Sequence, residues 1–352
     1  MFTAALERFG RSSIVALPLE EIAAARSWSP PQRWPHTWVT GGVAPDVDIC
    51  EESVQCRDGQ WRPIRIYRPA PDATAATGRG VRLPVLLYFH GGGYVLGNTR
   101  LYDPLCTWLA ATVPALVLSV DYRQAPEYRA PQALLDSIDA LHWAHRHARA
   151  MGADPERIAV CGDSAGGALA TLVTHAALDD GGPAIAFQAL LYPCTDATQS
   201  FPSARELSDA PVLSAEKIRI FTEHYLADVV PPTDPRVSAY FRPDLAGLPP
   251  ALVQTADLDP LRDEGLAYAD RLADAGVQVR ATNYLRTVHG YHSFPGATTM
   301  GDQARHELLV ELRRHLHARP SAADAAYPNA RRASVEVARA TPAIDATDEL
   351  AG

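Results

Sequence analysis

The feature that most restricts the fold of this chain is the pentapeptide GDSAG at positions 162–166. It follows the apolar run 157–161, which is typical of a buried strand, and it precedes a helical stripe over 165–178. A serine between glycines in this setting indicates a sharp strand-to-helix turn, because side chains at the glycine positions would collide with the neighbouring strand and helix. Such a turn exposes the hydroxyl of Ser164 at a helix N-terminus, where developing negative charge is stabilised. The pattern therefore predicts an α/β chain with Ser164 as a nucleophile.

Short apolar runs alternate with amphipathic stretches along the chain. Runs typical of strands buried on both faces lie at 85–89, 115–120, 158–161, 185–192 and 251–255, and helical stripes at 131–149, 165–178 and 262–275. This alternation predicts a mostly parallel central sheet with helices on both faces. Upstream, two runs at 47–56 and 61–67 flank a turn signal and predict an antiparallel hairpin at the sheet edge.

Two stretches lack this alternation. Residues 1–45 hold three tryptophans among prolines, and residues 195–248 are rich in proline, serine and aspartate, with one clear helix near 214–227. We expect both to form a helical cap over the carboxyl edge of the sheet, with a catalytic domain over 46–318. The alanine-rich tail 319–352 carries few large apolar groups, so we expect it to be disordered.

The motif HGGG at 90–93 ends the predicted strand 84–90. Glycines there let the backbone approach a substrate and offer N–H groups to an oxyanion. We expect donors among Gly91, Gly92 and Gly93, together with the N–H of Ala165. The sequence leaves open which two glycines donate, and it favours a structural role for His90 as a loop anchor.

Four acids compete in the stretch DLDPLRDE at 257–264, which follows a buried run. A triad acid belongs in the loop after a strand and follows the serine in chain order. Asp259 fits this position, and Asp257, closest to the strand, is the alternative. Asp263 and Glu264 fall in the first helical turn, where acids commonly complement the helix dipole.

Two histidines in the loop VHGYH at 288–292 are candidates for the base. His289 sits beside a glycine, so its imidazole can project over the sheet edge. We therefore expect His289 to accept the proton of Ser164 while Asp259 fixes its tautomer. For His292 we expect a packing role.

The composition excludes several other classes of protein. A formal net charge of -9, without a dense run of basic residues, disfavours a nucleic-acid partner. The chain has no long apolar stretch for a membrane span and no N-terminal pattern of a secretory signal, so we expect a cytoplasmic protein. Five dispersed cysteines, with no Cys-x-x-Cys pair, predict free thiols and no metal site.

Taken in order, five motifs resemble one known family. They are HGGGYVLG at 90–97, DYRQAPEYRAPQAL at 121–134, GDSAGG at 162–167, DLDPLRDEG at 257–265 and VHGYH at 288–292. Over roughly residues 45–317 the chain resembles the hormone-sensitive-lipase-like family of bacterial carboxylesterases. The resemblance implies the α/β-hydrolase fold, a cap, the triad Ser164, Asp259 and His289, no cofactor, and small-molecule esters with short to medium acyl chains.

Two other functions use the same residues differently. The first is a dedicated deacetylase or deacylase of one small metabolite, which would keep the triad and differ in its pocket. The second is a non-catalytic small-ligand binding protein on the same fold, against which the intact His289 argues. The sequence leaves the oligomeric state open, with a homodimer among the alternatives.

Overall fold

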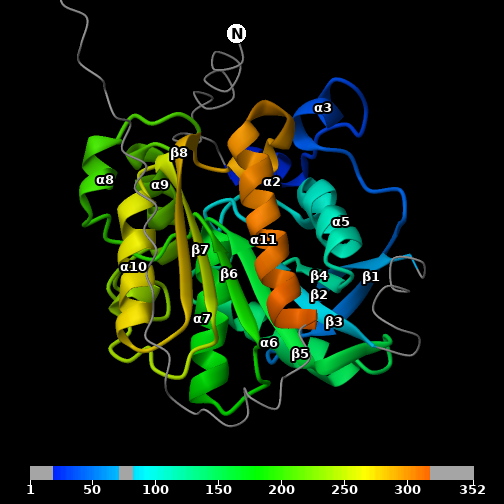
Figure 1. The fold of residues 1–352 in the computed structure, drawn as a ribbon. Coiled ribbons are helices and arrows are strands. Elements are labelled where there is room, and N and C mark those ends of the chain that lie inside the picture. Colours follow the sequence, from blue (N-terminus) through cyan, green and yellow to red (C-terminus); the bar gives the residue numbers. More distant parts are fainter. Residues whose placement is uncertain (1–18, 71–81, 318–352) are drawn as a thin grey trace, which may run out of the picture.

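The structure is a computed structural model that describes residues 19–70 and 82–317. The predicted disordered tail 319–352 and the first part of the predicted cap, residues 1–18, lie outside the described residues. Figure 1 shows a central sheet with helices packed on both sides, which confirms the predicted α/β-hydrolase architecture.

Eight strands form one sheet in the order β1-β2-β4-β3-β5-β6-β7-β8. From β4 to β8 all neighbouring strands are parallel, whereas β1, β2 and β4 pair antiparallel. The predicted hairpin is thus present, and β1 is the edge strand. The bounds are β1 (Val47–Gln55), β2 (Trp61–Pro69), β3 (Leu83–Phe89), β4 (Leu116–Val120), β5 (Ala153–Asp163), β6 (Phe187–Leu191), β7 (Ala251–Leu258) and β8 (Val279–Val288).

Of the main helices, three pack on one face of the sheet and two on the other. The main ones are α5 (Asp103–Thr112), α6 (Gln132–His147), α7 (Ala165–Asp179), α10 (Arg262–Asp274) and α11 (Thr299–His317). Helices α6, α7 and α10 pack on one face, and α5 and α11 pack on the other. The shorter α2 (Leu19–Ser27), α3 (His36–Thr40), α8 (Pro202–Glu206) and α9 (Ala215–Leu226) belong to the two segments predicted to form the cap.

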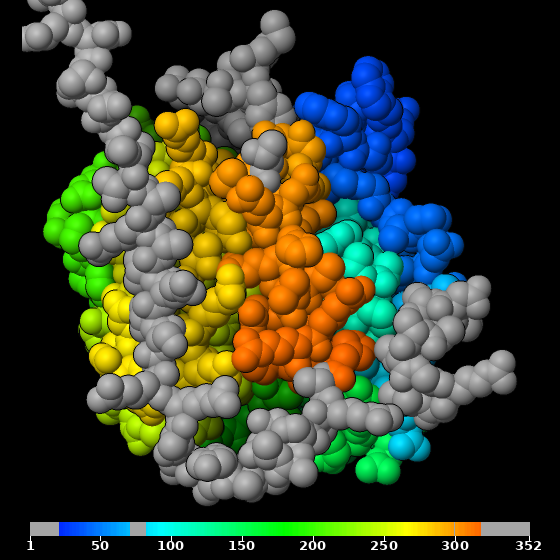
Figure 2. Space-filling model, viewed as in Figure 1, coloured from blue at the N-terminus to red at the C-terminus, as the bar shows by residue number. Residues whose placement is uncertain are grey.

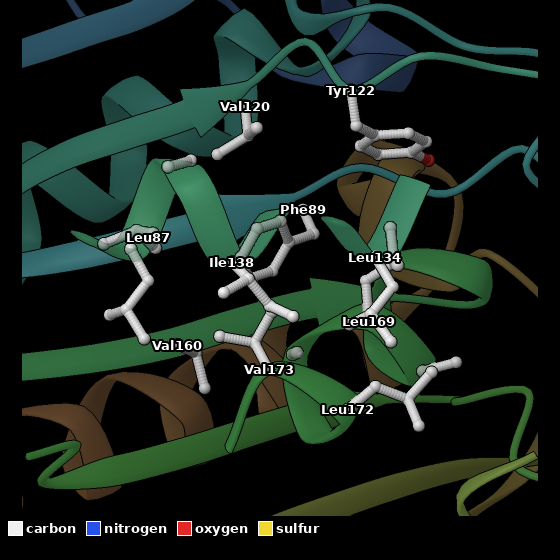
Figure 3. Packing of buried hydrophobic residues seen from close by; sticks show 14 of the residues in the cluster. Leu87, Phe89, Val120, Tyr122, Leu134, Ile138, Val160, Leu169, Leu172 and Val173 are labelled. Atoms are coloured by element: carbon white, nitrogen blue, oxygen red, sulfur yellow. The ribbon is translucent and has the colours of Figure 1, made fainter. Parts of the chain in front are cut away.

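Strand side chains alternate between the two layers of the core. Leu87 and Phe89 point to the layer of α6 and α7, while their neighbours Leu86 and Tyr88 point to the layer of α5 and α11. Figure 3 shows the first of these layers, in which strand side chains meet Ile138 of α6 and residues of α7. All seven residues of β3 are buried, as expected for a strand covered on both faces.

The turns that follow β3, β5, β7 and β8 hold every residue expected in the site. Because the carboxyl ends of parallel strands meet at one edge of a sheet, residues far apart in the chain come together there. The segment from α3 packs against η5 (Pro295–Ala297), just before α11. Figure 2 shows this segment in blue beside the start of α11 in orange.

Candidate active site

Ser164 lies on the predicted turn between β5 and α7. Its backbone has φ 56°, a left-handed value that non-glycine residues rarely adopt, and its N–H donates to the carbonyl of Leu191. A Cβ at Gly162 would lie 2.1 Å from Gly166 O, and one at Gly166 would lie 2.0 Å from Phe89 O. The close approach of strand and helix therefore requires both glycines, and it holds Ser164 in its strained position.

Ser164, His289 and Asp259 form a continuous chain of hydrogen bonds. His289 Nε2 lies 2.9 Å from Ser164 Oγ, and His289 Nδ1 lies 2.7 Å from Asp259 Oδ2. Asp259 is 1% exposed, and its other carboxylate oxygen accepts the N–H of Leu261 at 3.0 Å. A carboxylate fixed in this way orients the imidazole, so that Nε2 faces the serine hydroxyl.

The competing acids have other partners. Asp257 Oδ2 accepts the N–H of Arg286 at 3.3 Å, and Asp263 Oδ2 accepts the N–H of Ser203 at 2.9 Å. Glu264 is buried and accepts backbone N–H groups of residues 195 and 196, so it attaches the start of the 195–248 segment to α10. Among the four candidates, only Asp259 contacts His289 in the described structure.

His292 is buried and forms no hydrogen bond with Ser164 in the described structure. Its Nε2 lies 2.8 Å from Gln254 Oε1, and burial lowers the pKa of its imidazole well below the ordinary value. This arrangement agrees with a packing role. His90 is also buried, stacked on Tyr122 with ring centroids 4.4 Å apart, as expected for a loop anchor.

The three N–H groups of the glycine loop differ in whether they have a hydrogen-bond acceptor. Gly91 N–H donates to the buried Oδ1 of Asp163 at 2.8 Å and lies 3.2 Å from the hydroxyl of Tyr102. Burial raises the pKa of Asp163, while hydrogen bonds from its neighbours oppose this shift. In the described structure the N–H groups of Gly92 and Gly93 have no backbone or side-chain acceptor. These two glycines are therefore free to serve a ligand, and Gly91 is not.

Helix α9 packs directly on this loop. A Cβ at Gly93 would lie 2.4 Å from the ring of Phe221, so the helix and the loop touch without room for a side chain. The ring of Tyr94 stacks on that of Tyr225 with centroids 3.9 Å apart and an interplanar angle of 9°. Neither Phe221 nor Tyr225 was predicted from the sequence, since nothing local to α9 indicates what it contacts.

A cavity of about 610 Å³ opens at Ser164 and His289. Its walls are mostly apolar and come from both predicted cap segments, with Val39 on one side and Phe221 on another. Two cations, Lys217 and Arg305, also line it. The volume matches a small organic ligand rather than a polymer.

The described residues lack two other features. They contain no group of three or more histidine, cysteine, aspartate or glutamate side chains placed to hold a metal ion. No helix within 19–70 or 82–317 has the length and apolar character needed to cross a membrane.

Comparison with known proteins identifies the family. Residues 86–293 match a family model described as alpha/beta hydrolase fold. Esterase LipI of Mycobacterium tuberculosis is 42% identical over 280 residues, which cover 78% of this chain and 84% of LipI. Ethyl acetate hydrolase of Pseudomonas putida is 34% identical over 311 residues, covering 87% and 95% of the two chains.

Solved structures agree. EstE1, a thermophilic and thermostable carboxylesterase cloned from a metagenomic library, superposes with a TM-score of 0.75 at 34% identity, covering 86% of this chain and 99% of EstE1. The predicted resemblance is confirmed by sequence and by structure. The chain belongs to the hormone-sensitive-lipase-like carboxylesterase family within the α/β-hydrolase fold.

Proposed function

We propose that the protein is a serine carboxylesterase that hydrolyses small esters with short to medium acyl chains. The observation that carries this proposal is the hydrogen-bonded chain from Ser164 Oγ through His289 to Asp259. Relatives named as esterases and carboxylesterases support the same reaction. The mostly apolar cavity of about 610 Å³ supports substrates of this size.

The reaction proceeds through an acyl-enzyme. His289 Nε2 takes the proton of Ser164 as its oxygen attacks the ester carbonyl carbon, and the carbonyl oxygen becomes a tetrahedral oxyanion. His289 then gives the proton to the leaving alcohol. A water molecule repeats the sequence and releases the carboxylic acid, which returns Ser164 to its free form. Asp259 keeps Nδ1 protonated throughout and stabilises the imidazolium that forms at each step.

The oxyanion is stabilised by backbone N–H groups. We assign this role to Gly92, Gly93 and Ala165, since the N–H of Gly91 already donates to Asp163. Ala165 is the first residue of α7, so its N–H lies at the positive end of the helix dipole. Fixed donors of this kind are each worth on the order of 10²–10³ in kcat.

Labelling with a fluorophosphonate tests the proposal, with Ser164→Ala as the control. We expect the wild type to be labelled and to turn over p-nitrophenyl esters, with the highest kcat/KM between acetate and octanoate, while Ser164→Ala does neither. Equal labelling of the two proteins contradicts the assignment of the nucleophile.

The same panel separates the alternatives. Turnover confined to one class of acetylated metabolite, with no hydrolysis of simple esters, favours a dedicated deacetylase. Stoichiometric ligand binding without turnover favours a binding protein.

Four expectations from the sequence remain predictions. They are the bounds of the cap, the cytoplasmic location, the absence of a nucleic-acid partner and the homodimer.

A further inference from the structure

One wall of the cavity contains a buried cation that the proposed mechanism does not use. Arg305 lies in the second turn of α11, lines the cavity and is 7% exposed. Its Nη2 donates to the carbonyl of His292 at 2.6 Å, and its Nε is buried without an acceptor. Within the described residues Arg305 forms no ion pair. Of the five N–H groups that an arginine carries, one at Nη2 thus has an acceptor among the described residues, and the buried Nε–H has none.

No carboxylate among the described residues lies within ion-pair distance of Arg305. The guanidinium lies over the ring of Trp108, 5.3 Å from its centroid. Asp302, one turn earlier on the same helix, is exposed; it attracts the guanidinium electrostatically but forms no ion pair with it in the described structure. Burial lowers the pKa of Arg305 to about 10, so the group still carries its charge at neutral pH. An uncompensated buried charge is costly, and a counter-charge in the cavity would remove that cost.

A second buried arginine shows what a purely structural guanidinium looks like in this protein. Arg123 is 5% exposed, and it pairs with Asp136 at 2.6 Å and with Asp58 at 2.6 Å. The buried guanidinium of Arg123 is thus paired with two carboxylates. Arg305 lacks such a partner and faces the substrate cavity instead.

The cavity has a surplus of positive charge. The acid among its described lining residues is Asp163, whose carboxylate accepts hydrogen bonds from Tyr88, Tyr102 and Gly91. Lys217, the other cation, lies on α9, and its Nζ donates to the carbonyl of Val212 at 2.8 Å. An anion inside the cavity would therefore meet attraction from Arg305 and no free carboxylate.

We infer that Arg305 is a specificity residue that binds a free carboxylate of the substrate, so that the preferred esters carry a second, ionised acid group. The inference rests on the proposed esterase function and adds the substrate class. A half-ester of an aliphatic dicarboxylic acid fits it, with apolar walls around its methylenes and the charge at Arg305. A carboxylate on the alcohol side, as in an acetylated hydroxy acid, is the second form of this class.

Matched ester pairs test the inference by comparing kcat/KM for charged and neutral members. The acyl-side pair is monomethyl adipate and methyl hexanoate, and the alcohol-side pair is 6-acetoxyhexanoate and hexyl acetate. Arg305→Met keeps the length of the stem over Trp108 and removes the charge. We expect it to lower kcat/KM for the charged member of at least one pair tenfold or more, mainly through KM, and to change the neutral members less than twofold.

Lys217→Met is the matched control, because it removes a cation from the same cavity. We expect it to change the ratio of charged to neutral kcat/KM less than threefold. An equal loss on both members of each pair in Arg305→Met would show a structural role and overturn the inference. A larger effect of Lys217→Met on the charged esters would overturn it as well.

A measurement on the wild type keeps the test independent of folding in the variant. Adipate dianion should inhibit hydrolysis of hexyl acetate competitively and at least tenfold more strongly than hexane-1,6-diol. Equal or weaker inhibition by adipate contradicts the carboxylate site while leaving the esterase proposal intact. Failure to hydrolyse the neutral esters themselves would instead contradict the proposed function.

Discussion

The backbone N–H of Gly91 and the carboxylate of Asp163 form a buried hydrogen bond of 2.8 Å. Gly91 belongs to the glycine loop after β3, and Asp163 immediately precedes Ser164, so this bond joins the turns that follow β3 and β5. Tyr88 and Tyr102 donate their hydroxyls to the same carboxylate at 2.7 and 3.0 Å. The three donors fix the path of the chain that presents Gly92 and Gly93.

Asp163→Asn tests this connection. The amide replaces one acceptor oxygen by an NH₂ group that faces a donor, and a buried donor left unsatisfied costs about 1–3 kcal/mol. We expect the free energy of unfolding in urea to fall by that amount, and kcat to fall with little change in KM. Tyr102→Phe removes a single donor and should cost about 1 kcal/mol. If Asp163→Asn kept the stability and the kcat of the wild type, this result would contradict the structural role given to the carboxylate.

Asp259→Asn tests the acid of the triad. An amide can hold His289 in the wrong tautomer without disturbing packing, so we expect kcat to fall by about 10³–10⁴ with stability nearly unchanged. Asp257→Asn is the control, because Asp257 contacts the N–H of Arg286 and not the imidazole. Its kcat should stay within twofold of the wild type. A larger loss in Asp257→Asn than in Asp259→Asn would reverse the assignment.

Gly93→Ala tests the contact between the glycine loop and α9. Gly93 has φ +63°, and the added Cβ would lie 2.4 Å from Phe221, so the loop must move. We expect kcat to fall by about 10²–10³ through the loss of an oxyanion donor, measured with a p-nitrophenyl ester. Gly59→Ala is matched in backbone strain, with φ +82° and no atom within 4 Å of the added carbon. Gly59→Ala should lower the free energy of unfolding without lowering kcat. A loss of kcat in Gly59→Ala equal to that in Gly93→Ala would refute the steric explanation.

His175 gives the stability a predictable dependence on pH. Burial lowers the pKa of its imidazole from 6.5 to about 3, and its Nε2 lies 2.8 Å from the hydroxyl of Tyr268. Between these pKa values the unfolded chain binds a proton that the native protein does not, so the free energy of unfolding falls as pH falls below 6.5.

His175→Gln should remove this contribution. By pH 4.5 we expect the wild type to have lost about 2–3 kcal/mol more than the variant, each measured against its own value at pH 7.5 by urea unfolding. His306→Gln, at an exposed position, should follow the wild type. Parallel curves for the wild type and His175→Gln would show that this histidine does not contribute.

Much of the fold was predictable because buried parallel strands appear in the sequence as continuous apolar runs. The helix predicted over 165–178 is α7 (Ala165–Asp179), and the strand predicted over 251–255 lies within β7 (Ala251–Leu258). The order of the strands was not predictable, since the placement of β4 between β2 and β3 depends on how the connecting segments cross the sheet. Helix α5 was also missed from the sequence.

The site was predictable only where chemistry and sequence motif coincide. Ser164, Asp259 and His289 each follow a strand, and the structure brings them within hydrogen-bonding distance. Arg305 carries no such signal, because the pattern of α11 does not distinguish a guanidinium that faces a cavity from one that faces water. The engagement of Gly91 by Asp163 was equally hidden, since only the folded chain brings the two loops together.

The stacking of Tyr94 on Tyr225 has a consequence for how members of this family can diverge. Tyr94 directly follows the glycines that we propose as oxyanion donors, and Tyr225 belongs to α9, which lines the cavity. One helix therefore both lines the proposed substrate cavity and supports the glycine loop. A chimera that exchanges 195–248 for the same segment of a relative would alter this support along with the pocket. We therefore expect such an exchange to change turnover as well as substrate range, unless the glycine loop is exchanged with it.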